Sequence, residues 1–166
     1  MASNTESAAE ARGATKKEAF FADVEERIQT FSLAPRDGLD ADVRTDLRLC
    51  EGDILRGTLQ TLPEGFANNL HYHPAYEGFW MVVEGRVRFH GAGERVIGEF
   101  GPMEGVFIPR NGRYWFTRVS EGPARLLQVR GDAREGANKR VDVETQHADY
   151  GKSIVIERTE DEGSPA

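Results

Sequence analysis

The sequence contains a single cysteine, Cys50, among its 166 residues. One thiol cannot form an internal disulfide bond, so a reducing, cytoplasmic compartment is the simple interpretation. Leu47 and Leu49 precede it in an apolar alternation, which favours a buried, inert thiol over a nucleophile.

Long apolar runs are also scarce, and negative charge exceeds positive charge. No run approaches the roughly 18 residues of a membrane span, and the N-terminus lacks the apolar core of a secretory signal. The chain has 21 Lys and Arg against 28 Asp and Glu, a formal net charge of −7. We therefore expect no nucleic-acid partner and no membrane partner, because both favour a basic surface. A phosphate-binding loop and a GxSxG elbow are absent from the sequence as well.

The length fits one domain between two tails. Residues 1–15 are mostly small and polar and residues 158–166 are charged, so both segments predict disordered tails. Between them we expect a helix and loop over residues 16–38, and a β-barrel with a C-terminal extension over residues 39–157.

Apolar side chains recur at helical spacing near the N-terminus and predict one amphipathic helix from Lys16 to Phe31. Its apolar stripe consists of Phe20, Phe21, Val24, Ile28 and Phe31. Thr15 stands at a capping-box spacing before it. This apolar stripe must pack against another surface, either the outside of the barrel or a second subunit. We expect a homodimer.

From residue 43 onward the apolar period changes to two. The segments expected as strands are residues 43–50, 53–62, 69–73, 79–83, 86–89, 105–109, 113–119, 124–130 and 153–157. Asn111-Gly112 predicts a hairpin between the two strands that flank it, and residues 98–104 are expected to be a loop. Short strands with Gly-rich turns predict an all-β sandwich or barrel of the jelly-roll type.

Two histidines one residue apart, His71 and His73, precede a carboxylate, Glu77. Residues i and i+2 of a strand point to the same side, so the imidazoles point together if this segment is extended. Pro74 favours a bend after them, which lets Glu77 turn back toward them. Two imidazoles and one carboxylate suit Fe(II), with Mn, Ni or Zn also possible. We predict that these three residues bind a divalent metal ion.

The same stretch resembles the first motif of the cupin superfamily. It has Gly65, five residues, His71, one residue, His73, three residues, Glu77, seven residues and Gly85. The last gap is one residue longer than the family pattern, and we expect a β-bulge near its start to absorb the extra residue. The resemblance implies a cupin-type jelly-roll β-barrel over about residues 47–130.

The second cupin motif is matched less well, by residues 103–119. Pro109 aligns with it, but five residues later, where the family places its last histidine ligand, this chain has Tyr114. Three roles stay open for Tyr114: a weak ligand, a hydrogen-bond partner of a bound water, or a filler of the barrel. Partners that could orient the two imidazoles are Asn69, Tyr72 and Gln128.

Aromatic and basic residues near the motifs suggest a substrate pocket. Tyr76, Tyr114 and Trp115 fall at expected bends and could form a wall for a flat substrate. Arg113 is the candidate clamp for a substrate carboxylate, with Arg118 as the other choice. The simplest place for Phe79, Trp80 and Phe107 is the core, and for His90 and His147 the surface.

The resemblance implies a metal-dependent cupin enzyme acting on a small organic substrate, aromatic or carboxylate in nature. We expect a non-haem Fe(II) dioxygenase-like oxidoreductase in which Glu77 and Tyr114 take part in catalysis. Two alternatives remain open. One is a cupin isomerase or lyase, and the other is a non-catalytic small-molecule-binding cupin with a degraded metal site.

Overall fold

The computed structural model describes residues 15–35, 43–132, 140–143 and 154–157. The expected tails, apart from Thr15, lie outside the described residues, and so does His147. The chain divides into two compact units, Met1–Thr30 and Phe31–Ala166.

The first unit contains a helix over residues 15–25, which ends well before the expected Phe31. The backbone hydrogen bonds then span three residues instead of four, with Arg27 N–H donating to the Val24 carbonyl at 3.1 Å. Such tightening closes the last turn of a helix. Among the described residues, no helix has the length and apolar composition needed to cross a membrane.

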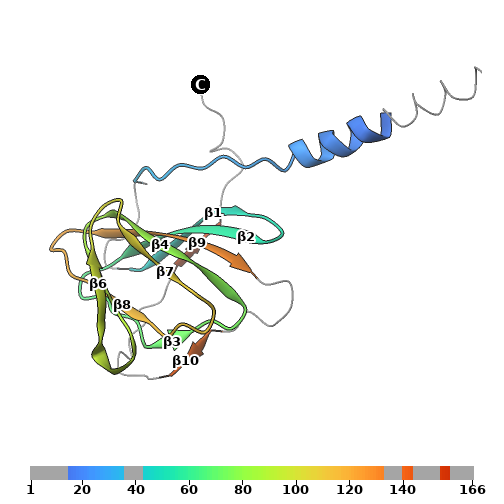
Figure 1. Ribbon diagram of the computed structural model, residues 1–166. Helices are drawn as coiled ribbons and strands as arrows, with labels where there is room; N and C mark the ends of the chain where they lie inside the picture. Colours follow the sequence, from blue (N-terminus) through green and yellow to red (C-terminus); the bar gives the residue numbers. More distant parts are fainter. Residues whose placement is uncertain (1–14, 36–42, 133–139, 144–153, 158–166) are drawn as a thin grey trace, which may run out of the picture. The chain divides into compact units, whose positions relative to one another are not determined.

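The described part of the second unit is built from short strands and one 3₁₀ turn (Figure 1). The elements are β1 (Thr45–Glu51), β2 (Leu55–Leu62), β3 (His71–Tyr72), β4 (Tyr76–Glu84), β5 (Val87–His90), η1 (Ala92–Glu94), β6 (Val96–Phe100), β7 (Gly105–Ile108), β8 (Trp115–Arg118), β9 (Ala124–Asp132), β10 (Val141–Asp142) and β11 (Ile154–Ile156). The large sheet has the order β11-β1-β2-β9-β4-β7, and the small sheet has the order β6-β5-β8. β3 pairs with β10. The predicted all-β jelly-roll barrel is therefore confirmed.

Two local predictions are wrong. β7 and β8 do not form a hairpin, because β7 pairs with β4 and β8 pairs with β5. The turn between them is present, with Gly112 N–H donating to the Pro109 carbonyl at 3.0 Å, but the chain crosses from one sheet to the other there. The loop expected over residues 98–104 begins inside β6, where Gly98 lies opposite Phe89 as an ordinary strand residue.

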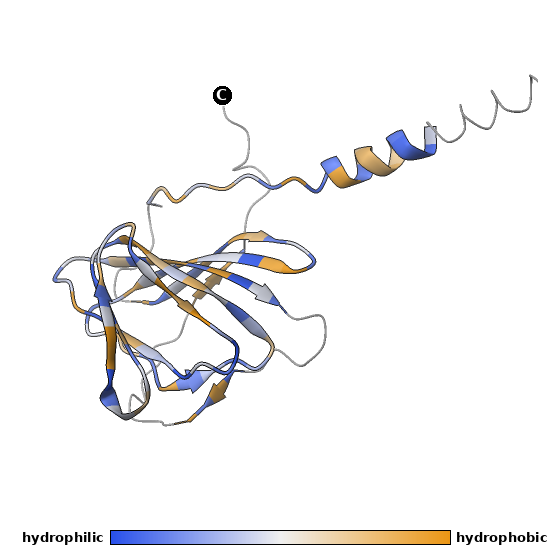
Figure 2. Ribbon diagram, in the orientation of Figure 1, coloured by the Kyte–Doolittle hydropathy of each residue, from blue (hydrophilic) through white to orange (hydrophobic). Residues whose placement is uncertain are grey.

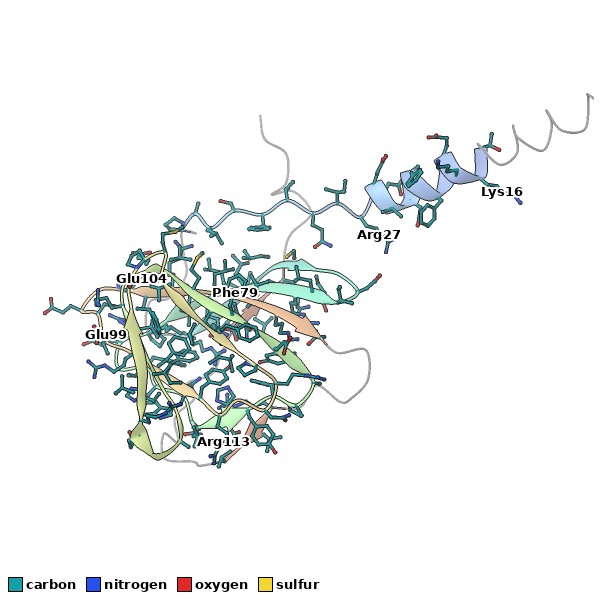
Figure 3. The ribbon with its side chains drawn as sticks, viewed as in Figure 1. Lys16, Arg27, Phe79, Glu99, Glu104 and Arg113 are labelled. Atoms are coloured by element: carbon teal, nitrogen blue, oxygen red, sulfur yellow. The ribbon has the colours of Figure 1, made fainter. Side chains whose placement is uncertain are left out.

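The main core lies between the two sheets, and Figure 3 shows side chains filling this interior. Its buried residues are Leu62, Phe66, Trp80, Val82, Val87, Phe89, Tyr114, Phe116, Ala124 and Leu126. Trp80 is in the core as predicted, but Phe79 and Phe107 are 42% and 59% exposed. They pair across β4 and β7, and the alternation that turns Trp80 inward turns Phe79 outward.

A second cluster covers the other face of the large sheet. It consists of Leu47, Leu49, Leu59 and Leu127, with Leu33 packed against it. The Arg125 guanidinium donates hydrogen bonds to the carbonyls of Leu33 and Ala34, which ties this segment to the sheet. Hydrophobic and hydrophilic residues alternate along the strands (Figure 2). Because the leucines of β1, β2 and β9 face outward, their polar neighbours face into the barrel.

Candidate functional site

The inward polar residues line a cavity of about 240 Å³ inside the barrel. Its charged lining residues are Arg44, Asp46, Arg48, Arg56, Arg130 and Arg140, and its neutral polar ones are Thr58, Gln60, Asn68, His71, His73, Tyr76, Tyr114 and Gln128. Five arginines thus surround the cavity with one carboxylate among them, although the chain carries a net charge of −7. A concave site lined by one sign of charge concentrates the opposite charge.

On the inner face of the large sheet, the side chains change from apolar to cationic along the strands. The successive rows across β2, β9 and β4 are Gln60–Leu126–Val82, Thr58–Gln128–Trp80 and Arg56–Arg130–Gly78. The cavity therefore opens where the core ends and the arginines begin.

The two histidines of the motif both line this cavity, as their spacing predicted. Their ring centroids are 5.0 Å apart, and the rings are nearly perpendicular. The Nδ1 atom of His71 lies 2.7 Å from the Asn69 carbonyl oxygen. Nδ1–H therefore donates to this carbonyl when the ring is neutral, which leaves Nε2 as the acceptor atom. The Asn69 backbone carbonyl therefore orients the His71 ring.

Both imidazoles are neutral at pH 7. Burial lowers the pKa of His71 to about 4, with the Arg140 guanidinium as the next cause. Burial also lowers the pKa of His73 to about 3, and His71 and Arg140 act in the same direction. A buried imidazole beside cations is more stable without its proton.

Glu77 does not join the two imidazoles. It is exposed on β4 and is not among the residues that line the cavity. The extra residue of the motif is absorbed by a register shift between Val82 and Glu84, not near Gly78 as expected. β4 therefore keeps one alternation from Tyr76 to Val82, and burial of Val82 in the core turns Tyr76 inward and Glu77 outward.

Tyr76 occupies the inward position beside His73. Their rings stack with 4.1 Å between centroids. Gln128 Nε2 lies 3.4 Å from the Tyr76 hydroxyl, and the Arg130 guanidinium lies 4.7 Å from the centre of the Tyr76 ring. Two residues predicted from the sequence, Tyr76 and Gln128, thus meet inside the cavity.

Tyr114 is buried beside His71, with a relative exposure of 1%. The backbones of the two residues bond reciprocally at 3.0 and 3.1 Å, and their ring centroids are 4.4 Å apart. Burial raises the pKa of Tyr114 well above its usual 10, and the neighbouring Tyr76 acts in the same direction. The side chain is therefore a neutral phenol that lines the cavity beside His71.

The other predicted pocket residues lie elsewhere. Trp115 is buried against His90, with 3.9 Å between stacked rings, so Trp115 does not line the cavity and His90 is not a surface residue. Arg113 is exposed outside the cavity, at the end of the barrel that carries β3 and β10 (Figure 3). Arg118 donates hydrogen bonds to backbone carbonyls, among them that of Leu62 at 3.2 Å. Tyr72 pairs with β10 and is not among the lining residues.

The sequence reasoning missed the arginines of the cavity. Their signal was present as polar residues at every second position: Arg44 just before β1, Asp46 and Arg48 in β1, Arg56, Thr58 and Gln60 in β2, and Gln128 and Arg130 in β9. The alternation shows that these residues share a face, but not that the face is the inner one. Cys50 was expected to be buried and is only partly so.

Two sheets closed around a polar cavity in this strand order define a double-stranded β-helix protein. Residues 58–130 match the family model described as cupin domain. Over these residues the barrel therefore matches the cupin family.

Solved structures support this fold. An uncharacterized conserved protein with a double-stranded β-helix domain from Klebsiella pneumoniae is 15% identical with a TM-score of 0.53, over 73% of this chain and 94% of that one. An RmlC-like cupin family protein from Methanocaldococcus jannaschii is 13% identical with a TM-score of 0.51, over 63% and 91%. A polyketide cyclase from Streptomyces resistomycificus is 24% identical with a TM-score of 0.50, over 58% and 68%. No curated protein matches the chain.

The divalent metal implied by the family fits this cavity poorly. The two neutral imidazoles suit a cation, since a ligand nitrogen must be unprotonated. However, Glu77 faces outward, and the part of the chain that the structure describes has no group of three His, Cys, Asp or Glu side chains able to hold a metal ion. Arg140 also disfavours positive charge at both imidazoles. In this structure Glu77 therefore does not meet His71 and His73 at one point, and binding of a metal ion by these three residues remains a prediction.

Proposed function

We propose that the barrel is a small-molecule-binding cupin whose ligand occupies the cavity between the histidines and the inner face of the large sheet. The observation that carries this proposal is the unsatisfied polar lining. His73 Nδ1 and Gln60 Oε1 are buried without a hydrogen-bond partner in the structure, and both residues line the cavity. Buried polar atoms are almost always satisfied, so a polar ligand is the natural partner for this lining.

The size of the cavity indicates a small ligand. Pockets for drug-sized molecules have volumes of about 300–1,000 Å³. The cavity here has about 240 Å³, so its ligand is smaller than that class. Tyr76 and Trp80 add apolar area to the polar lining, which suits an organic molecule better than an inorganic ion.

Binding is favoured over acid–base catalysis by the protonation state of the histidines. A general acid or base works best when its pKa lies near the operating pH. The pKa values of His71 and His73, about 4 and about 3, make both imidazoles weak bases at neutral pH. They serve better as hydrogen-bond acceptors for a ligand hydroxyl or amide.

A nuclear magnetic resonance titration tests this proposal. The probes are a set of small neutral, anionic and cationic organic fragments added to the full-length protein, and the readout is the ring resonances of His71 and His73. We expect at least one class to shift them and to bind His73→Ala more weakly. Glu77→Gln is the matched control, since its side chain lies outside the cavity, and it should bind as the wild type does. The proposal fails if no fragment class reaches the rings.

A metal-dependent enzyme is the second candidate function, and the neutral imidazole pair favours it. We expect Fe(II) dioxygenase-like chemistry or the chemistry of an isomerase or lyase in that case, with Mn, Ni or Zn as alternative ions. Plasma emission on the purified protein separates the candidates. A near-stoichiometric metal content that is lost in the double variant His71→Ala, His73→Ala would favour the enzyme, and equal contents in both proteins would exclude it.

A further inference from the structure

Two arginines face each other directly inside the barrel. Arg56 on β2 and Arg130 on β9 are partners in the strand register, and both line the cavity. On its other side Arg130 lies opposite Gly78, which has no side chain to cover it. Like charges directly opposite each other destabilise a sheet. This pairing therefore needs negative charge close to it.

Three carboxylates, Glu51, Asp132 and Glu157, supply negative charge close to this pairing, but they do not satisfy every N–H group of the two guanidiniums. Glu51 forms an ion pair with Arg56 and also with Arg48, whose Nη1 lies 3.2 Å from Glu51 Oε2. Arg130 Nε lies 3.6 Å from Asp132 Oδ1, which is too long for a hydrogen bond. The Nε atoms of Arg56 and Arg130 are both buried without a hydrogen-bond partner in the structure.

The surroundings of Arg130 also hold it in place. Its guanidinium lies over the Tyr76 ring, and the backbone at Gly78 packs closely against Arg130, where an added Cβ would come within 2.8 Å of the Arg130 Cα. Stacking on an aromatic ring orients the planar guanidinium and leaves its edge free to donate. The Arg130 charge also acts on His73 and lowers the pKa of that imidazole, so a ligand at Arg130 is within electrostatic range of His73.

We propose that Arg56 and Arg130 bind the carboxylate of a small organic acid whose remaining part extends toward His73. This inference rests on the proposed function and names its ligand class. A carboxylate accepts parallel hydrogen bonds from guanidinium groups, so it supplies acceptors for the two unsatisfied Nε–H groups together with further negative charge. The residue first considered for this role, Arg113, is exposed outside the cavity.

Matched pairs of acids and their amides test whether the ligand is a carboxylate. The full-length protein is titrated with acetate, succinate and benzoate, and with acetamide, succinamide and benzamide, while the Nε–H resonances of its arginines are followed. We expect at least one acid to shift the Nε–H signals of Arg56 and Arg130 and to bind at least tenfold more tightly than its amide. Arg130→Gln should weaken that acid at least tenfold, and the control Arg113→Gln should leave it unchanged.

The other outcomes contradict the inference in distinguishable ways. If amides bind as tightly as acids, or Arg130→Gln binds the acid normally, the ligand class is wrong although the cavity still binds small molecules. If inorganic phosphate binds more tightly than every acid, the assignment of a carboxylate ligand is also wrong. If no probe perturbs the cavity, this inference and the proposed function fail together. Should Arg130→Gln not fold, Arg130→Lys and the wild-type Nε–H signals give the same test.

Discussion

The ring of Tyr76 stacks on the imidazole of His73, with 4.1 Å between their centroids and 26° between their planes. The same ring lies under the Arg130 guanidinium, and its hydroxyl accepts a hydrogen bond from Gln128. Tyr76 thus connects the histidine side of the cavity with its cationic side, at the inward position that the motif led us to expect for a carboxylate.

Substitutions at Tyr76 should separate its hydroxyl from its ring. Tyr76→Phe removes the partner of Gln128 and should cost about 0.5–1.5 kcal/mol in the free energy of unfolding. Tyr76→Leu also removes the ring contacts with His73 and Arg130, and should cost about 1–2 kcal/mol more. Urea unfolding measures both values. Equal stability of the two variants would show that the stacking contributes nothing.

The stability of the protein should fall as the pH drops from about 6.5 toward 4. The folded pKa values of His71 and His73, about 4 and about 3, lie below the ordinary 6.5. In this window the unfolded chain binds protons that the folded chain does not, so acid favours unfolding, by at most about 1.4 kcal/mol per pH unit for each imidazole. Above pH 6.5 neither state binds these protons, and the contribution is fully present.

The double variant His71→Gln, His73→Gln isolates this effect. Its unfolding free energy, measured in urea at pH 7, 6 and 5, should depend less steeply on pH than that of the wild type. Parallel pH curves for the two proteins would mean that other groups account for the acid sensitivity.

Gly78→Ala should destabilise the barrel. A Cβ at this position would overlap the Val129 carbonyl oxygen and come within 2.8 Å of the Arg130 Cα. Overpacking against backbone costs about 1–3 kcal/mol or more. Gly122→Ala is the matched control, since no heavy atom lies within 4 Å of its added Cβ, and it should stay within about 0.5 kcal/mol of the wild type. Thermal unfolding of both variants provides the comparison.

The homodimer expected from the sequence remains a prediction. Phe20 and Phe21 of the N-terminal helix are 62% and 42% exposed, and large exposed apolar side chains favour association. Light scattering at micromolar concentration should give twice the chain mass of 18.5 kDa. The double variant Phe20→Ser, Phe21→Ser should lower that mass if the helix forms the contact. A wild-type protein that runs as a monomer would contradict the prediction.

The barrel could be predicted from the sequence because its signals are local. Alternation and glycine turns specify strands, and the HxH spacing alone turns His71 and His73 to one side. The orientation of Glu77 could not be predicted, because it depends on where β4 shifts register against β9. The role of Arg56 and Arg130 was missed for a related reason. The alternation of polar and apolar residues defines two faces of the large sheet but does not say which one is outer. In the structure Leu33 packs against the leucine cluster, so the leucines lie on the outer face and the arginines on the inner one.

The register shift next to Val83 has a consequence for the whole strand. Deleting this one residue would straighten β4 and reverse the direction of every side chain before it, since a slip of one residue exchanges the two faces. Phe79 and Met81 would replace Trp80 in the interior, and Glu77 would enter the cavity in place of Tyr76. Deletion of a single codon would therefore place a second carboxylate among the five arginines of the cavity, and β4 has apolar residues on both faces that could fill the core in either orientation.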